Sequence, residues 1–493
     1  MKTLRIWSFL FLFFLTFITK AQEVKGAILE VVTNLPIPYA TVSVDNNYTF
    51  TNEQGEFNLK TYIYNSNDSI LISAIGYKDL KLSIKNLTDR IYLSPSPYEL
   101  NEVVLLNKKP DINQLIEKVN ASFEKNYATR LDKKLVFLRE STLDSIENLG
   151  IKLNHSTYPE IDSQFFTSVL KTLPRSSNFF IESLFNLYGA PSNQKVEMIK
   201  TFLLRDENNN IDSQIIENKI GTLLEKRLNL GSFFKLKSGV FSKKLETNNF
   251  TLETFEDSIP VSKSKKDLYL EQKSHAINRG KNAEKILKNI FLSEESSLDV
   301  FKKPNKYDFE IIDITEENND YIYTVRFMSK RKSGFKGVMQ INENDAAVLK
   351  IKYSNVSDLK SFSLFGFKFK DNLDSGIQIF KKNEAKTYDL VFSQEKTGSL
   401  VSISRPLSLI EKKKNQFFSK KINRVDLDLD ISIINIKTVE YFMLDNKPIT
   451  NKEFKLYTPN YDFKKTRLKK FDPTFWDGYS TLEPNDLIKN FKF

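Results

Sequence analysis

Short segments of alternating polar and apolar residues, separated by turn-forming residues, dominate residues 22–105 and constrain most strongly what this chain can fold into. In Tyr39–Val44 every second residue is apolar, which is the period of a strand with one buried face. Asn52–Gly55 is typical of a tight turn, and Gly55 is free to take a positive φ there. Such segments recur roughly every 8–12 residues, so we predict an all-β sandwich over 22–105.

Four motifs in this region occur in the order and spacing of a known family. They are Val24–Gly26, Pro36–Val42, Thr51–Phe57 and Ile72–Lys78. With them, the region resembles the carboxypeptidase-regulatory-like domain, and Leu100–Val104 looks like the segment that often closes this module in envelope proteins of Gram-negative bacteria. The resemblance implies a transthyretin-like β-sandwich. It implies no catalytic activity here, because the carboxypeptidases behind the family name carry their catalytic domain on a separate piece of chain.

Beyond the sandwich, the spacing of the apolar residues changes. A linker helix is predicted within 106–130, where apolar residues follow helical spacing. Residues 131–450 are predicted to form an α+β domain, with a curved, half-barrel-like antiparallel sheet of about eight strands and a helical insertion at about 155–301. Residues 451–493 form an aromatic C-terminal tail without a clear period.

This larger region resembles, more loosely, the uncharacterised β-rich domain that follows the sandwich in some envelope proteins. The resemblance is carried by Phe137–Glu140, Tyr307–Asp313, Tyr323–Phe327 and Gly337–Asn342. The expected architecture is similar to the half-barrels of periplasmic lipoprotein carriers. A likeness of fold alone says little about function.

The first 21 residues have the layout of a secretory signal peptide. Lys2 and Arg5 form a positive start, and the apolar run from Ile6 to Ile18 is shorter than the roughly 20 residues of a spanning helix. Small residues before Gln22 predict cleavage there. We therefore expect an exported protein of the periplasm, the outer membrane or the cell surface.

The chain has no cysteine and only two histidines, which limits the chemistry open to it. Disulfides, thiol catalysis and thiolate metal sites are excluded. A zinc carboxypeptidase site needs two histidines and a glutamate, but neither His155 nor His275 is followed by a glutamate at the required spacing. We predict surface or structural histidines, no catalytic residue, no cofactor and no metal site.

Two acidic patterns resemble the start of a calcium loop. In the first, Asp426, Asp428 and Asp430 alternate with apolar residues, which predicts a strand with one polar face. Both patterns lack the glycine that the calcium loop requires, because Ile431 and Ile211 stand in its place. The second pattern consists of Asp206, Asn208, Asn210 and Glu217.

A formal net charge of +11 makes the chain basic. Nucleic acid is the usual partner of a basic chain, but the predicted export argues against it. Lysine runs such as Lys263–Lys266 and Lys412–Lys414 are typical of solvated surfaces. Attraction to anionic envelope polymers or to lipid head groups, with peripheral association at the outer membrane, is the remaining functional interpretation.

These patterns favour a non-catalytic binding or scaffold protein. The sandwich would be a docking module, and the second domain would hold an envelope protein, a glycan or a lipophilic ligand. Two alternatives stay open: a carboxylate-dependent glycan hydrolase and an outer-membrane β-barrel-associated protein, suggested by the aromatic end Phe491–Phe493. A solvent-open apolar cavity in the second sheet would favour the carrier. Two carboxylates roughly 5–10 Å apart across a cleft would favour the hydrolase.

Overall fold

The chain divides into two compact units. The first unit comprises Met1–Ser96 and Asp472–Lys489, and the second comprises Pro97–Phe471 and Asn490–Phe493. The computed structural model describes residues 24–45, 47–59, 68–96, 111–127, 129–171, 173–206, 232–239, 241–245, 265–317, 320–414 and 419–492. The predicted signal peptide lies outside these residues, as does the predicted domain boundary after residue 105. Within them, no helix is both long and apolar enough to span a membrane.

The first unit contains the predicted β-sandwich. One sheet has the strand order β4-β1-β7 and the other has the order β3-β2-β5-β6. The elements are β1 (Val24–Glu30), β2 (Thr41–Val44), β3 (Asn47–Phe50), β4 (Glu56–Leu59), β5 (Ser69–Ser73), β6 (Leu80–Ser83), the 3₁₀ helix η1 (Ile84–Asn86) and β7 (Arg90–Leu93). Alternate residues of both sheets, such as Ile28 on β1 and Val42 and Ile72 on β2 and β5, point into one shared apolar core and are fully buried.

The turn before β4 confirms the role predicted for Gly55. Its φ is +74°, and a Cβ on this residue would lie 2.5 Å from the carbonyl oxygen of Ile28. The Gly55 carbonyl accepts a hydrogen bond from the Ile28 amide at 2.8 Å. Only glycine combines this left-handed backbone with such a close approach of another strand.

A segment from the C-terminal end of the chain belongs to the first unit. The Asn52 side chain donates a hydrogen bond to the Pro484 carbonyl at 2.9 Å. Lys489, in α7 (Asp486–Lys489), forms an ion pair of 2.6 Å with Glu56. Burial alone would raise the pKa of Glu56, but hydrogen bonds from Lys489 and Asn52 outweigh it and lower this pKa. Part of the predicted aromatic tail therefore packs with the sandwich.

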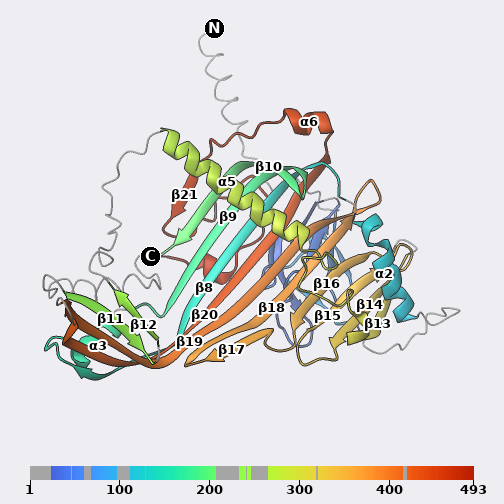
Figure 1. The fold of residues 1–493 in the computed structure, drawn as a ribbon. Coiled ribbons are helices and arrows are strands. Elements are labelled where there is room, and N and C mark those ends of the chain that lie inside the picture. Colours follow the sequence, from blue (N-terminus) through green and yellow to red (C-terminus); the bar gives the residue numbers. More distant parts are fainter. Residues whose placement is uncertain are drawn as a thin grey trace, which may run out of the picture. The chain divides into compact units, whose positions relative to one another are not determined.

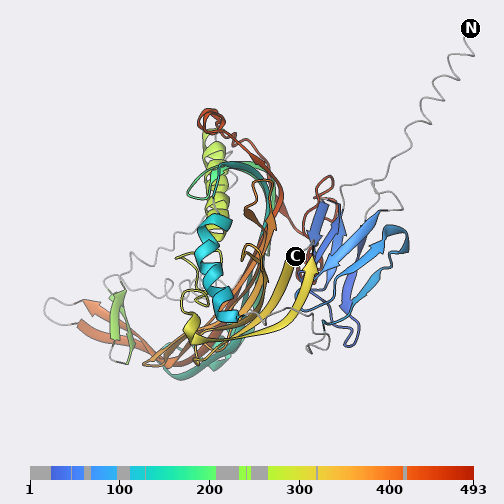
Figure 2. The same cartoon turned by 90° about the vertical axis from the view of Figure 1, so that its right-hand side faces the viewer.

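The second unit is built on one 14-stranded sheet of order β13-β14-β15-β16-β18-β19-β20-β8-β9-β10-β21, with β11, β12 and β17 paired at its side (Figure 1). Its strands are β8 (Asp132–Ser156), β9 (Ser176–Ala190), β10 (Asn193–Arg205), β11 (Ser232–Ser238), β12 (Phe241–Leu245), β13 (Tyr307–Glu317), β14 (Asp320–Ser329), β15 (Phe335–Asn342), β16 (Val348–Asn355), β17 (Lys360–Leu364), β18 (Phe367–Lys382), β19 (Tyr388–Lys414), β20 (Ser419–Pro448) and β21 (Lys465–Leu468). The predicted curved sheet is confirmed (Figure 2), although it has more strands than expected and β21 pairs in parallel with β10.

The prediction of a mostly helical stretch at about 155–301 is wrong in its first part, where β9 and β10 are long strands. Consecutive residues of β10, such as Phe202, Leu203 and Leu204, are all buried, so both faces of this strand are covered. A strand buried on both faces loses its polar–apolar alternation, and its apolar run imitates a helix.

Four helices accompany the sheet in the described part of the second unit. They are α2 (Ile112–Asn126), α3 (Ser163–Lys171), α5 (Lys265–Lys288) and α6 (Asn451–Leu456), with the 3₁₀ helix η3 at Pro304–Lys306. The predicted linker helix corresponds to α2, whose N-terminus is capped by Asp111. Figure 2 shows α2 and α5 on the same side of the curved sheet.

Candidate functional site

Contacts from α5 identify the helix side of the large sheet. Arg279 and Asn282 of α5 both donate hydrogen bonds to the Glu140 carboxylate on β8. Residues paired across antiparallel strands share a face, and every second residue along a strand returns to it. The helix side can therefore be followed from Glu140 along β8 and across its neighbours.

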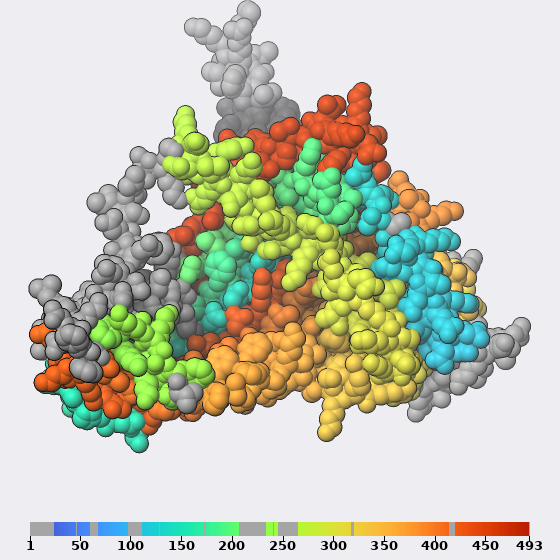
Figure 3. Space-filling model, in the orientation of Figure 1, coloured from blue at the N-terminus to red at the C-terminus, as the bar shows by residue number. Residues whose placement is uncertain are grey.

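Two adjacent rows of apolar side chains cross four long strands on this side, and we call them the apolar strip. Pairing places Ile146 opposite Ile433, Ile433 opposite Val401, and Val401 opposite Phe369. The second row runs through Leu149, Ile431, Ile403 and Phe367. All eight side chains are half-buried rather than enclosed. Figure 3 shows this face hollowed between α5 and the orange rim of β18 and β19.

A polar band separates the apolar strip from the residues beneath α5. It consists of Asp144, Asn435, Ser399 and Asp371 in one row and Thr142, Lys437, Thr397 and Asp374 in the next. The Asn435 side chain donates a hydrogen bond of 2.6 Å to Asp144. The floor of the hollow is therefore polar near α5 and apolar farther along the strands.

Beyond the strip, the same side of the sheet is covered. Leu153 and Leu427 pack against the buried cluster that includes Phe166 of α3. On the opposite face, the row that lies between the two rows of the strip is polar and consists of Asn148, Ser432, Ser402 and Lys368. Among the described residues, the strip is thus an apolar surface left open between two covered regions.

Two carboxylates with raised pKa values lie at the polar end of the hollow. Burial raises the pKa of Glu395, and the nearby Asp374 adds to this effect. Burial also raises the pKa of Asp374. Asn289 donates a hydrogen bond to Glu395 at 3.1 Å, and Ser297 donates one to Asp374 at 3.0 Å. Such groups are candidates for proton transfer, although structural carboxylates show the same shifts.

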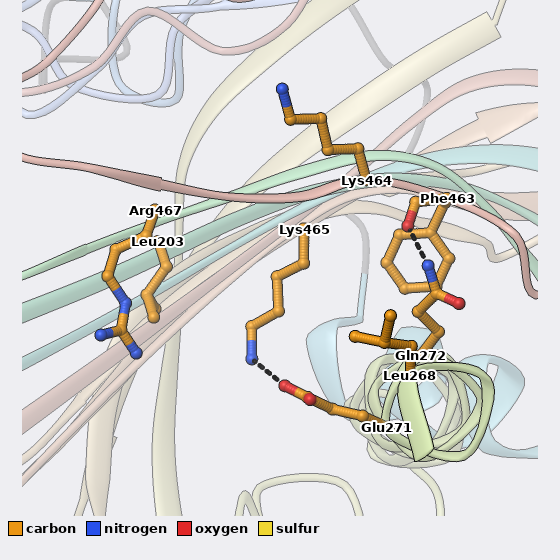
Figure 4. A pocket seen from close by; sticks show the side chains of 8 residues that line it. All are labelled: Leu203, Leu268, Glu271, Gln272, Phe463, Lys464, Lys465 and Arg467. Carbon is orange, nitrogen blue, oxygen red and sulfur yellow. Dashed lines mark hydrogen bonds and ion pairs between the residues drawn. The ribbon is translucent and has the colours of Figure 1, made fainter. Parts of the chain in front are cut away.

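A separate cleft of about 350 Å³ lies between α5, β10 and the segment leading into β21. Its lining residues are Leu203, Leu268, Glu271, Gln272, Phe463, Lys464, Lys465 and Arg467. In Figure 4, the Lys465 ammonium points toward Glu271, 3.9 Å away, whereas Lys464 points away from it. Gln272 donates a hydrogen bond to the Phe463 carbonyl at 2.6 Å. These contacts within the wall favour a structural role over a ligand site.

The two histidines lie far apart in sequence and in different settings. His155 is exposed on β8, whereas His275 is partly buried in α5 with its ring 5.8 Å from that of Phe463. Burial, aided by Arg279 and Lys465, lowers the pKa of His275 to about 4. His275 is therefore neutral at physiological pH.

The calcium-like patterns have different outcomes. Asp426, Asp428 and Asp430 lie on β20, so the predicted strand is confirmed. Asp426 pairs with Arg424 at 2.6 Å, and Asp430 accepts a hydrogen bond from Asn148. Of the second pattern, Asn208, Asn210 and Glu217 lie outside the described residues. Among the residues that are described, no three His, Asp or Glu side chains gather as metal ligands, and the absence of a metal stays a prediction.

One local pattern pointed to the strip, whereas its rows across the strands were not predicted. The alternation in Val425–Ile433 predicted a strand with an apolar face, but not that this face stays open. The rows depend on pairing between β8 and β20, which are separated by almost three hundred residues. No local pattern predicts such a register.

Comparison with solved structures gives only weak likenesses. A chain named as an outer membrane lipoprotein-sorting protein domain from Vibrio parahaemolyticus has 9% identity, covers 70% of this chain and 97% of its own, and gives a TM-score of 0.18. A chain of the MucA/MucB complex from Pseudomonas aeruginosa has 6% identity, covers 68% of this chain and 99% of its own, and gives a TM-score of 0.16. These scores are too low to support any statement about this chain.

The N-terminal region has a clearer match. A search of curated proteins finds no match to the chain. The family model described as "CarboxypepD_reg-like domain" matches residues 24–105. This range covers the motifs and all seven strands of the sandwich. The sandwich at the start of this chain is therefore a CarboxypepD_reg-like domain.

Proposed function

We propose that this chain is a non-catalytic binding protein and that the apolar strip holds a lipophilic chain, such as the acyl chain of a lipid. The open strip is the observation that supports this function. Neighbouring strands are about 4.8 Å apart, so four strands give a strip roughly 15 Å long and two side chains wide. This long, narrow shape suits an extended alkyl chain.

Burial of the strip supplies the driving force for binding. Each half-buried Ile, Leu or Phe still exposes apolar surface, and covering it contributes about 25 cal/mol per Å². Soluble proteins rarely leave contiguous apolar patches without a binding role. The polar band runs alongside the strip, so Lys437 and the Asn435–Asp144 pair would lie beside the ligand and face its polar head.

Ligand titration with matched variants tests this function. The full chain would be titrated with a fluorescent long-chain fatty acid, with Ile433→Thr in the strip and Ile434→Thr on the opposite face of β20 as control. Both changes remove the same apolar volume from one strand and keep its β propensity. We expect Ile433→Thr to bind the fatty acid more weakly than the wild type, and Ile434→Thr to bind it as the wild type does. The double variant Ile403→Thr/Ile433→Thr should bind about tenfold more weakly.

Equal affinities for the strip and control variants would overturn the proposal. If an apolar peptide binds and displaces the fatty acid while the latter binds only weakly, the occupant is a partner segment rather than a lipid. Circular dichroism of each variant confirms that the sheet is retained.

The CarboxypepD_reg-like domain is proposed to act as a docking module of an exported protein. The turn after β1 exposes Val31, Val32 and Leu35 by 49%, 74% and 62%, which gives a partner an apolar contact. Export rests on the sequence of the first 21 residues. Intact mass of the protein from an envelope fraction is expected to place the mature N-terminus at Gln22. Retention of Met1 on cytoplasmic protein would contradict export.

A carboxylate-dependent hydrolase is the second candidate, because Asp374 and Glu395 have raised pKa values near the hollow. A hydrolase needs one protonated and one ionised carboxyl group, whereas these two are shifted in the same direction. Glycan release by the wild type that is lost in Glu395→Gln would favour this candidate over the binding role.

A further inference from the structure

Four exposed apolar side chains form an aromatic edge beside the strip. Phe362 and Leu364 on β17, Phe365 in the turn that follows, and Phe241 on β12 are 50%, 49%, 59% and 54% exposed. The rings of Phe241 and Phe365 are 5.8 Å apart, and Phe362 lies 6.4 Å from Phe367. Among the described strands, β17 pairs with β18 alone and is therefore an edge of the sheet.

The backbone at Phe365 carries strain that folding does not explain. Phe365 has a φ of +50° and Gly366 a φ of +78°. Two successive left-handed residues in a hairpin turn strongly favour Asn-Gly, and a bulky residue at the first position is unfavourable. Since the Phe365 side chain is mostly exposed, little packing offsets this strain. A strained, displayed aromatic residue points to a function for its side chain.

Lysine dominates the charge around the aromatic edge, although Asp358 and Asp371 flank it. The two segments that carry it, 232–245 and 360–370, contain seven lysines and no aspartate or glutamate. On β17 and β18 the side chains alternate, so that Phe362, Leu364, Phe367 and Phe369 share one face and Lys368 and Lys370 the other. Lys370 pairs with Asp358 at 2.5 Å, and Lys244 lies 4.8 Å from the Phe233 ring.

We propose that the aromatic edge docks on the surface of an anionic lipid bilayer. Aromatic rings lie at the head-group level of membranes, and lysines near the surface are attracted to anionic lipids. Lysine side chains can place their apolar stems beside the rings and their ammonium groups at the phosphates. The excess of lysine favours an anionic surface over a basic partner. This site does not depend on ligand binding in the strip.

The test is co-sedimentation of the full chain with vesicles of phosphatidylcholine alone or of phosphatidylcholine and phosphatidylglycerol in equal parts. We expect binding to the anionic vesicles, weakened by added salt, and little binding to phosphatidylcholine. Phe365→Asn creates the Asn-Gly turn that the backbone favours. It should therefore make the hairpin at least as stable while weakening vesicle binding about tenfold.

Leu456→Asn on α6 is the matched control, because Leu456 is 73% exposed but lies outside the aromatic edge. We expect it to bind vesicles as the wild type does. Anionic-vesicle binding that Phe365→Asn leaves unchanged would overturn the proposal, as would the absence of binding to either vesicle. Loss of binding in Leu456→Asn as well would show that apolar surface in general, not the aromatic edge, is responsible.

Discussion

In the first unit, the apolar faces of two small sheets meet, and a core of thirteen residues is at most 6% exposed. In the second unit, the strands alternate in the same way, but the apolar strip on the helix side stays half-exposed. The same local pattern thus yields a closed core in one region and an open surface in the other. Polar–apolar alternation therefore predicts which face of a strand is apolar. What packs against that face depends on the tertiary fold.

The two regions also differ in what they bury. Among its described residues, the sandwich buries apolar side chains together with the uncharged Thr49, Thr51 and Asn52. The large sheet buries Arg139 on β8, which pairs with Glu182 at 2.5 Å and Glu440 at 3.2 Å. Burial opposes the positive charge, but the two carboxylates outweigh it and raise the pKa of Arg139. The second unit therefore adds a buried ion cluster to the apolar packing that both units share.

Removing Arg139 should have the largest effect. Arg139→Ala leaves the Glu182 and Glu440 carboxylates buried without their cation, which should destabilise the second unit by about 3–5 kcal/mol. Urea unfolding of the full chain would measure the loss. The triple variant Arg139→Met/Glu182→Gln/Glu440→Gln is the control and should recover much of the stability. A loss below about 1 kcal/mol in Arg139→Ala would contradict the buried ion cluster.

A pair of identical substitutions tests the contrast between closed core and open strip. Ile72 in the sandwich is fully buried, and Ile431 in the strip is half-buried. Ile72→Ala should cost about 3 kcal/mol, because it leaves a cavity. Ile431→Ala should cost about 1 kcal/mol, because solvent already reaches it. Equal losses in urea unfolding would mean that the strip is part of a closed core.

As the pH falls from 6.5 toward 4, protonation of His275 should destabilise the second unit, in which His275 lies. Its pKa is about 4 in the fold, below the ordinary value near 6.5 that it regains on unfolding. The stability from neutral His275 is therefore present above pH 6.5 and is lost as the pH falls toward 4. The wild type should lose up to about 3 kcal/mol more than His275→Gln over this window. The free energy of unfolding would be measured against pH for the wild type and for His275→Gln. Two curves that run parallel over this window would refute the assignment to His275.

Substitutions at two glycines of the sandwich distinguish the cost of backbone strain from the cost of a steric clash. Gly55 and Gly76 both have a positive φ, but only at Gly55 would a Cβ meet another atom closely. Gly76→Ala should cost about 1 kcal/mol, and Gly55→Ala about 2 kcal/mol or more. Thermal unfolding would compare them. Equal costs would show that the close approach of Ile28 relaxes without a penalty.

The sequence predicted the sandwich well because its signals are local. Tyr39–Val44 alternates within one strand, and Gly55 marks its own turn. It predicted β9 and β10 poorly, because residues such as Phe202 and Leu203 are buried on both faces and show no alternation. Neither the contact between Asn52 and Pro484 nor the rows of the strip could be predicted, since they join segments hundreds of residues apart.

Locating a bound lipophilic chain in a crystal is the most direct test of the proposal that the strip is an open binding surface. A crystal of the full chain with a fatty acid brominated along its alkyl chain would locate the bromine atoms by anomalous scattering. We predict bromine positions along the strip, in contact with Ile433, Val401 and Phe369 on β20, β19 and β18. Bromine located only elsewhere, with the strip closed by the protein itself, would contradict the account.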